Sequence, residues 1–113
     1  MITNLTGRKR YQKETSESLK KIVQNLTDPN DLKVLDVSEV KDMSELFVDK
    51  HYSVDISGWD VSNVTNMECM FLNSDFDEDL SRWDVHNVKN YDYCFWSSPL
   101  ENQPNKQPKF VIL

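Results

Sequence analysis

The chain has 113 residues and a net charge of −6, with 38% hydrophobic and 11% aromatic residues. This length and composition indicate one globular domain. They exclude a membrane-spanning helix, because no segment approaches the required run of about 20 apolar residues. The first residues lack the apolar stretch of a secretory signal peptide. With only two cysteines, we expect a cytoplasmic, reduced protein, which would reach a surface only by another export route.

Charge is unevenly distributed along the sequence. Residues 1–27 contain six basic and two acidic residues, whereas residues 28–101 contain five basic and seventeen acidic residues, a net charge of −12. This acidic part disfavours nucleic acid and favours a basic protein partner. We interpret the basic run Arg8-Lys9-Arg10 as a solvated end of the chain rather than a nucleic-acid-binding arm.

Residues 15–26 are predicted to form an amphipathic helix that caps one end of the fold. Thr15 or Ser16 is the expected N-cap, and the T-D-P-N sequence at 27–30 is expected to stop the helix. The apolar residues recur at the spacing of one helix face: Leu19, Ile22, Val23 and Leu26.

Residues 35–47, 59–71 and 83–95 repeat one motif with a fixed period of 24 residues. Their sequences are LDVSEVKDMSELF, WDVSNVTNMECMF and WDVHNVKNYDYCF. A fixed period in the twenties is typical of a repeat fold in which each unit buries its apolar side against the next. Leu32, Ile56 and Leu80 extend each unit to the L-x-x-L-x-L pattern of a leucine-rich repeat.

Within each unit, two elements are predicted. In each unit two apolar residues flank a polar one, as Leu35 and Val37 flank Asp36, and this alternation predicts a short strand with one buried face. The three-residue spacing of Val61, Val64, Met67 and Met70 then predicts a tight 3₁₀ or α turn, with Asp42, Asn66 and Asn90 as its caps. The resulting fold class is α/β, a small right-handed leucine-rich-repeat-like solenoid of about three 24-residue coils with an N-terminal helix cap. We divide it into a basic segment and helix cap (1–31), the solenoid (32–100), and a C-terminal cap and tail (101–113), with an apolar plug at 110–113.

The motif W-D-V-S-N-V-T-N-M-x-x-M-F resembles the short-repeat, mycoplasma-type branch of the BspA-like leucine-rich-repeat surface proteins of bacteria. The resemblance covers roughly residues 14–110. It implies binding of proteins or matrix.

The candidate binding residues lie at positions that should point outwards from the predicted strands. Third-repeat residues Arg82 and His86 depart from the pattern, whereas buried positions keep it, which favours a specific surface there. The alternative for the aspartates is that each accepts backbone N–H bonds from its own turn. The partner-binding candidates are Asp36, Asp60, Ser62, Arg82, Asp84 and His86.

The sequence offers no pattern for catalysis, a cofactor or a metal. There is no nucleophile–base pair or phosphate-binding glycine loop, and the acidic stretch at 75–79 lacks the glycine of a calcium loop. We expect it to be a solvated loop. Cys69 and Cys94 should face different sides, so we expect neither a disulfide nor a zinc site.

We therefore expect a non-enzymatic protein-binding module. Two alternatives remain open: a small acidic inhibitor of a basic partner, such as an immunity or anti-defence protein, or a single unit of a surface adhesin array.

Overall fold

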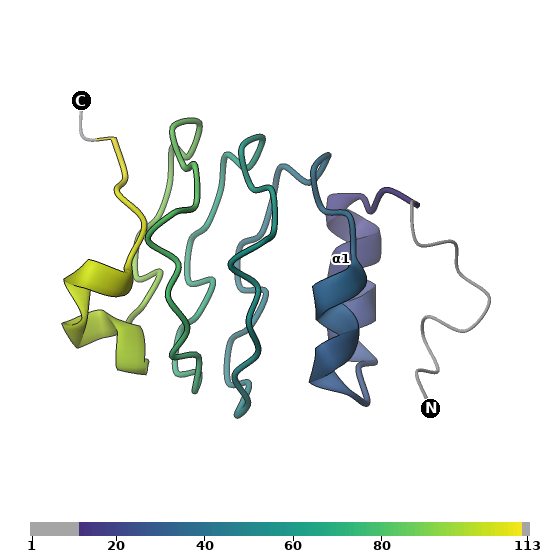
Figure 1. Cartoon of the computed structure of the whole chain (residues 1–113), viewed down its shortest axis with the longest axis horizontal. Coiled ribbons are helices and arrows are strands. Elements are labelled where there is room, and N and C mark those ends of the chain that lie inside the picture. Colours follow the sequence, from purple (N-terminus) through teal and green to yellow (C-terminus); the bar gives the residue numbers. More distant parts are fainter. Residues whose placement is uncertain (1–11, 112–113) are drawn as a thin grey trace.

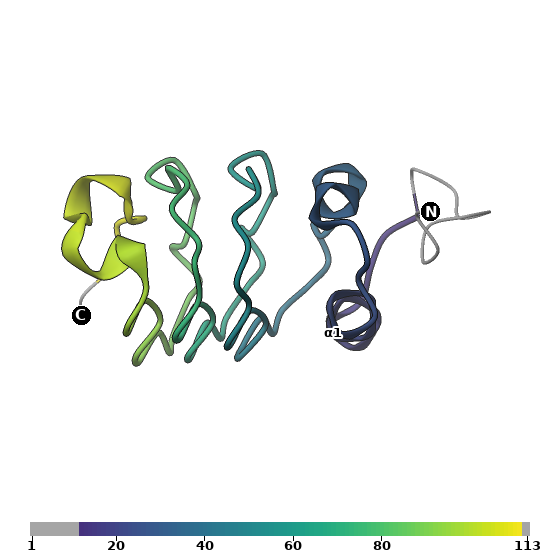
Figure 2. The same ribbon diagram turned by 90° about the horizontal axis from the view of Figure 1, so that it is seen from below.

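The computed structural model describes residues 12–111, which include one α-helix and three short 3₁₀ helices. α1 and η2 lie at one end of the 42 Å long axis, and η3 and η4 lie at the other (Figure 1, Figure 2). In chain order the elements are α1 (Ser16–Gln24), η2 (Pro29–Val34), η3 (Pro99–Asn102) and η4 (Pro104–Lys106). Within the described part of the chain, no helix has the length and apolar character needed to cross a membrane.

The predicted helix near the N-terminus is confirmed. The Thr15 hydroxyl accepts a hydrogen bond from the Ser18 N–H at 3.0 Å, and the Ser18 hydroxyl accepts one from the Thr15 N–H at 2.8 Å. This reciprocal pair satisfies N–H groups at the helix start that have no partner within the helix. The predicted apolar face is buried at Leu19, Ile22 and Val23, so α1 is held by packing as well as by its cap.

The predicted α/β class is wrong, and so is the leucine-rich-repeat solenoid. Over residues 12–111 the backbone forms no strand and no sheet, but only isolated bridges such as those joining Asn66 to Asp42 and to Asn90. A leucine-rich repeat requires a strand in every unit. Where strands were expected, the chain instead makes tight turns closed by hydrogen bonds from Val40 N to Val37 O (2.9 Å) and from Val64 N to Val61 O (3.0 Å).

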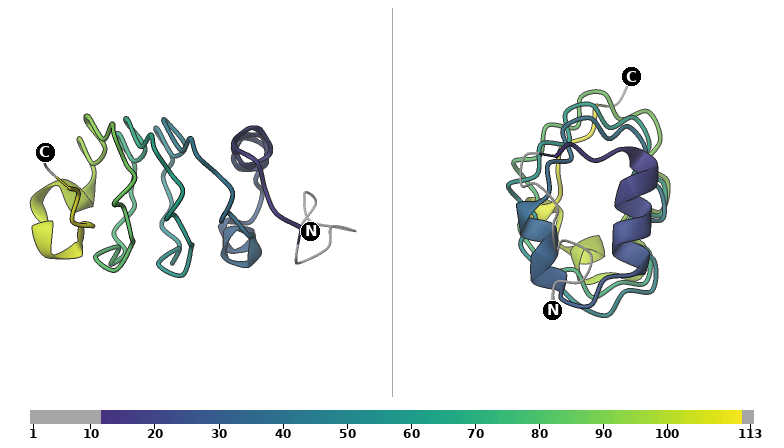
Figure 3. Two further views of the ribbon diagram at one scale, coloured as in Figure 1. Left: turned by 90° about the horizontal axis from the view of Figure 1, so that it is seen from above. Right: turned by 90° about the vertical axis from the view of Figure 1, so that its right-hand side faces the viewer.

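The 24-residue period appears instead as backbone hydrogen bonds between residues 42–49, 66–73 and 90–97, which we call the first, second and third ladder segments. In the first two segments, every second N–H donates to the carbonyl 23 residues later. The turns of chain that carry these segments lie beside one another along the long axis (Figure 3). From the first to the second segment the pairs are Met43–Asn66 (2.9 Å), Glu45–Glu68 (2.9 Å), Phe47–Met70 (2.8 Å) and Asp49–Leu72 (3.1 Å). From the second to the third they are Met67–Asn90 (2.7 Å), Cys69–Asp92 (2.9 Å), Phe71–Cys94 (2.8 Å) and Asn73–Trp96 (2.8 Å).

Positive φ angles prevent the ladder segments from becoming regular strands. Each angle belongs to the third residue of a tight turn, as in the turns that Met70 N–Met67 O (3.2 Å) and Ser74 N–Phe71 O (3.1 Å) close. Positive φ at this position is the mark of type II turns. Consecutive turns of this kind therefore replace the 3₁₀ or α turn that the three-residue spacing predicted. The residues are Glu45 (58°), Asp49 (60°), Cys69 (55°), Asn73 (53°), Tyr93 (57°) and Ser97 (60°).

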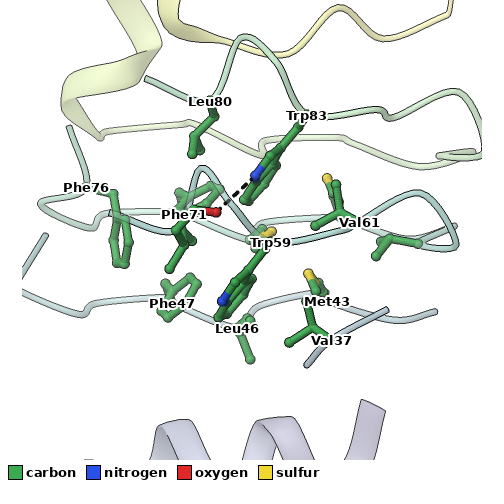
Figure 4. Packing of buried hydrophobic residues seen from close by; sticks show 14 of the residues in the cluster. Val37, Met43, Leu46, Phe47, Trp59, Val61, Phe71, Phe76, Leu80 and Trp83 are labelled. Atoms are coloured by element: carbon green, nitrogen blue, oxygen red, sulfur yellow. Dashed lines mark hydrogen bonds between the residues drawn. The ribbon is translucent and has the colours of Figure 1, made fainter. Parts of the chain in front are cut away.

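The core is a row of aromatic rings that follows the repeat. Phe71 stacks between Phe47 and Phe95, with ring centroids 5.5 and 5.6 Å away. Trp59 packs on Phe47 and Trp83 on Phe71, each with centroids 6.2 Å apart (Figure 4). Each of these tryptophans thus packs on the phenylalanine of the preceding ladder segment.

Both buried tryptophans also satisfy a backbone carbonyl of the preceding repeat. Trp59 Nε1 donates to Leu32 O at 2.9 Å, and Trp83 Nε1 donates to Ile56 O at 3.1 Å. Figure 4 draws the second of these bonds. Because a buried indole N–H needs an acceptor, the repeat fixes the position of the ring as well as its burial.

The C-terminal residues pack against the third repeat. The Phe110 ring stacks on Tyr91 with centroids 4.0 Å apart, and Leu80 N donates to Lys106 O at 2.8 Å. The expected packing of an apolar C-terminal residue is confirmed for Phe110, whereas Val111 is 48% exposed. Residues 112–113 of the predicted plug and the Arg8–Arg10 run lie outside the described residues. The division at residues 31 and 100 stays a prediction.

Candidate functional site

The candidate aspartates form one row, and each closes a turn. Asp36 Oδ1 accepts hydrogen bonds from the Ser38 N–H (3.0 Å) and the Ser38 hydroxyl (2.6 Å). Asp60 repeats this arrangement with Ser62 at the same two distances. The alternative reading of these carboxylates, that each binds its own turn, is therefore confirmed.

The third turn of the row uses a histidine in place of the serine. Asp84 Oδ1 accepts from the His86 N–H at 3.2 Å, and His86 Nδ1 lies 2.6 Å from the same oxygen. Nδ1 must carry a proton to donate this bond. His86 therefore supplies the donor that the serine hydroxyl supplies in the other two repeats, so a fold-related role accounts for part of its departure from the pattern.

The aspartate row is ionised at neutral pH. Hydrogen bonds from the Ser62 hydroxyl, and then from its N–H, lower the pKa of Asp60, although the neighbouring carboxylates of Asp84 and Asp36 raise it. The hydroxyl and the N–H of Ser38 lower the pKa of Asp36 in the same way, and the side chain and the N–H of His86 lower the pKa of Asp84. Since Asp60 is affected by both neighbours, the three charges lie close enough to act together on a partner.

Ser62 differs from the charged candidates because its hydroxyl and its carbonyl are both already hydrogen-bonded within the chain. Its hydroxyl is bound to Asp60, and its carbonyl accepts from Asn87 Nδ2 at 2.7 Å. The equivalent bond from Asn63 Nδ2 to Ser38 O, at 2.8 Å, joins the first two repeats. The Ser62 hydroxyl thus closes its own turn and its carbonyl joins adjacent repeats, which argues against its selection as a partner-binding residue.

Arg82 and the residues at the equivalent positions of the other repeats, Val34 and Gly58, face solvent, as expected for Arg82. Val34 is 53% exposed, Arg82 is exposed, and a Cβ atom built on Gly58 would meet nothing within 4 Å. These three positions carry three different residue types because the fold places no packing demand on them. Arg82 also lies near enough to Asp79 to lower the pKa of that carboxyl, after the stronger effects of Ser81.

The acidic loop at 75–79 is more ordered than a freely solvated loop. Asp77 Oδ1 accepts from Gln103 Nε2 (2.7 Å) and Lys106 Nζ (3.1 Å), which connects the loop to η4. Glu78 accepts from the Ser53 hydroxyl at 2.7 Å. In the described part of the chain, no group of three or more His, Cys, Asp or Glu side chains could hold a metal ion.

The two cysteines face different environments, as predicted. Cys94 is buried, and burial raises the pKa of its thiol well above the usual range. Cys69 is partly exposed, and its pKa is raised first by desolvation and then by neighbouring carboxylates. Neither thiol has the electropositive surroundings of a catalytic nucleophile.

Sequence reasoning missed two surfaces beside the ladder segments. Lys20 of α1 donates to Asp42 Oδ2 (3.3 Å) and to the Ser44 hydroxyl (3.2 Å), beside a pocket of about 340 Å³ between α1 and the first ladder segment.

The second surface lies at the third ladder segment, where the side chains of Tyr93 and Trp96 are 61% and 55% exposed. The available signal for the second surface was the change from Cys69 and Leu72 to two aromatic residues.

Comparison with known proteins gives one match. A family model described as "Mycoplasma protein of unknown function, DUF285" matches residues 17–110. No curated protein and no solved structure matches the chain significantly.

Proposed function

The chain belongs to the DUF285 family, and we propose that it is a non-enzymatic protein-binding module whose aspartate row (Asp36, Asp60 and Asp84) contacts basic side chains of a partner. The observation that carries the proposal is the spacing and ionisation of these carboxylates. Each occurs one 24-residue period after the last, and each has a lowered pKa.

The carboxylates can take a partner without giving up their role in the fold. Each turn uses Oδ1, and Oδ2 has no hydrogen-bond donor among the described residues. Lysine or arginine side chains would reach these free oxygens, and arginine could do so with two parallel hydrogen bonds. A regular row of charges favours fast association and correct register more than it favours high affinity.

A small acidic inhibitor of a basic protein is the second candidate. The net charge of −6 favours it, because inhibitors of nucleic-acid-binding enzymes gain on-rate from opposite charge.

The repeat motif also supports a relationship, at the level of sequence, between this family and the BspA-like repeats, in which case the module would serve as an adhesin unit.

Replacement of aspartate by asparagine tests the proposal without breaking the turns. Asn keeps the Oδ1 acceptor but loses the charge, so the double variant Asp60→Asn/Asp84→Asn should stay folded, with a melting temperature lowered only by the share of stability that the two charges supply. A partner captured by the full chain from the source organism, and then purified, should bind this variant about tenfold or more weakly. The control Asp49→Asn/Asp75→Asn removes two exposed charges elsewhere and should bind normally. Equal affinity of both double variants would refute the proposal.

Two further variants separate the roles of the third-repeat candidates. Arg82→Glu reverses an exposed charge and tests whether Arg82 itself contacts an acidic group of the partner: binding should then weaken with little change in melting temperature. A partner that contacts only the aspartate row should bind this more acidic variant at least as well. His86→Ser restores the residue of the other repeats and keeps the donor to Asp84, so it should be stable. If His86→Ser also binds normally, the histidine serves the turn alone.

A further inference from the structure

The peptide groups that join the ladder segments all point in one direction. In the second segment, the carbonyl of Met70 accepts from Phe47 N at 2.8 Å, and the N–H of the same peptide group, on Phe71, donates to Cys94 O at 2.8 Å. Three other peptide groups of this segment are used in the same way. Four parallel rows of hydrogen-bonded peptides therefore run along the stack, and their dipoles add as they do in a helix.

The carbonyl end of these rows faces α1. Lys20 Nζ lies 3.3 Å from Asp42 Oδ2, and the Ser16 hydroxyl accepts from the Asp42 N–H at 3.1 Å. Lys20 and Val23 of α1 also line the pocket beside the first ladder segment. A second copy of the chain could not extend the rows at this end without displacing α1.

The N–H end of the rows lies open at the third ladder segment. Of the four N–H groups at this end of the rows, that of Ser97 donates to Glu101 Oε1 at 3.1 Å, and those of Tyr91, Tyr93 and Phe95 have no acceptor among the described residues. Tyr93 is exposed, whereas Phe95 contributes its ring to the core. Phe110 covers the ring of Tyr91. The free donors occur at every second residue, which is the period at which an extended chain presents carbonyls along one edge.

Two exposed aromatic side chains stand beside these donors. Tyr93 and Trp96 form an edge-to-face pair with centroids 5.6 Å apart. The equivalent residues of the second segment are Cys69 and Leu72, so this pair occurs only in the segment that no further segment covers. Exposed tyrosine and tryptophan are the residues that most often dominate the energy of protein interfaces. The adjacent Asp92 is exposed and acidic.

We propose that the third ladder segment is a docking edge for an extended segment of a partner protein. Backbone carbonyls of that segment accept the N–H groups of Tyr93 and Phe95, an apolar side chain covers Tyr93 and Trp96, and a lysine or arginine faces Asp92. This mode uses the same one-way N–H to carbonyl bonds that join the ladder segments of the chain itself, and it resembles strand addition, although the docking edge is not a regular strand. Two copies meeting edge to edge would place N–H against N–H, so the occupant is a partner and not a second copy.

This inference rests on the proposed protein-binding function, but it places the contact away from the aspartate row. The probe is a phage-displayed library of random peptides of about 10 residues, the upper length of a common strand, selected on the full chain. Selected peptides are synthesised, and their affinity is measured by fluorescence anisotropy. Trp96→Ala should weaken binding about tenfold or more, whereas the control Val34→Ala, at another exposed apolar residue, should change it less than about twofold.

Amide hydrogen exchange locates the bound peptide. Binding should slow exchange at Tyr93 and Phe95 by about tenfold or more, and leave Cys69 and Phe71, which are already bonded, unchanged. Peptides that bind Trp96→Ala as well as the natural chain, or a library that yields no Trp96-dependent peptide, would overturn the docking edge. If the captured partner then still requires Asp60 and Asp84, the proposed function stands without this edge. If it requires neither surface, both proposals fail.

Discussion

Replacing Trp83 by alanine removes a side chain that is 4% exposed and packs on Phe71 with ring centroids 6.2 Å apart. Truncation of a buried tryptophan costs about 3–5 kcal/mol of unfolding free energy. The carbonyl of Ile56 loses the indole donor that lies 3.1 Å away, but it keeps the hydrogen bond from the Trp59 N–H at 3.0 Å, so it is not left unpaired. We therefore expect a loss of about 3–5 kcal/mol, a large part of the roughly 5–15 kcal/mol by which a typical domain is stable.

Two variants control this experiment. Trp96→Ala deletes the same atoms from a side chain that is 55% exposed, and it should change stability by less than about 0.5 kcal/mol. Trp83→Phe keeps an aromatic ring but loses the N–H, so its cost should fall between the two. Urea unfolding followed by far-UV circular dichroism measures all three without relying on tryptophan fluorescence. A difference of less than about 1 kcal/mol between Trp83→Ala and Trp96→Ala would refute the assignment of Trp83 to the core.

Three other predictions concern titration, an unpaired hydroxyl and thiol reactivity. The melting temperature should fall between about pH 5 and pH 2, because carboxylates with lowered pKa stabilise the fold above their unfolded pKa of about 3.9, and this contribution is lost as the pH falls through the folded pKa. Asp31, whose pKa burial raises, acts in the opposite direction, and a flat melting temperature over this range would contradict the prediction. Tyr52→Phe should leave stability unchanged or raise it by up to about 1 kcal/mol, since burial raises the Tyr52 pKa to about 12 and its hydroxyl has no hydrogen-bond partner among the described residues; calorimetry showing a large loss would reveal an acceptor. Cys69 should react with a thiol reagent well before Cys94, and mass spectrometry that finds equal labelling of the native protein would contradict the burial of Cys94. The carboxylates with lowered pKa are Asp36, Asp42, Asp55, Asp60, Asp77, Asp79 and Asp84.

The local features of this fold could be predicted from sequence, but the path of the repeat backbone could not. The α1 helix follows from its cap and its apolar spacing, which act within a few residues. The 24-residue period also identified buried positions, since Leu80, Trp83 and Val85 are all 4% exposed or less. The ladder segments were missed because they depend on positive φ at residues such as Glu45 and Tyr93, and neither residue type signals that conformation.

The candidate site shows the same division between local and long-range information. The turn-closing role of the aspartates was foreseen as an alternative, because an aspartate accepts such bonds from residues two positions away. The departure at His86 could not be interpreted from sequence, since the imidazole replaces a serine hydroxyl only through the geometry of the turn. The importance of Trp96 likewise depends on its place at the open end of the ladder, which is a property of the assembled chain.

Backbone amide exchange of the free protein tests the ladder most directly. The N–H groups of Cys69 and Phe71 donate to the third ladder segment at 2.9 and 2.8 Å, whereas those of Tyr93 and Phe95 have no acceptor among the described residues. Nuclear magnetic resonance should therefore show exchange at Cys69 and Phe71 that is slower by about a hundredfold or more than at Tyr93 and Phe95. Equal protection at the four amides, or faster exchange at Cys69 and Phe71, would contradict both the direction of the peptide rows and the open edge at which they end.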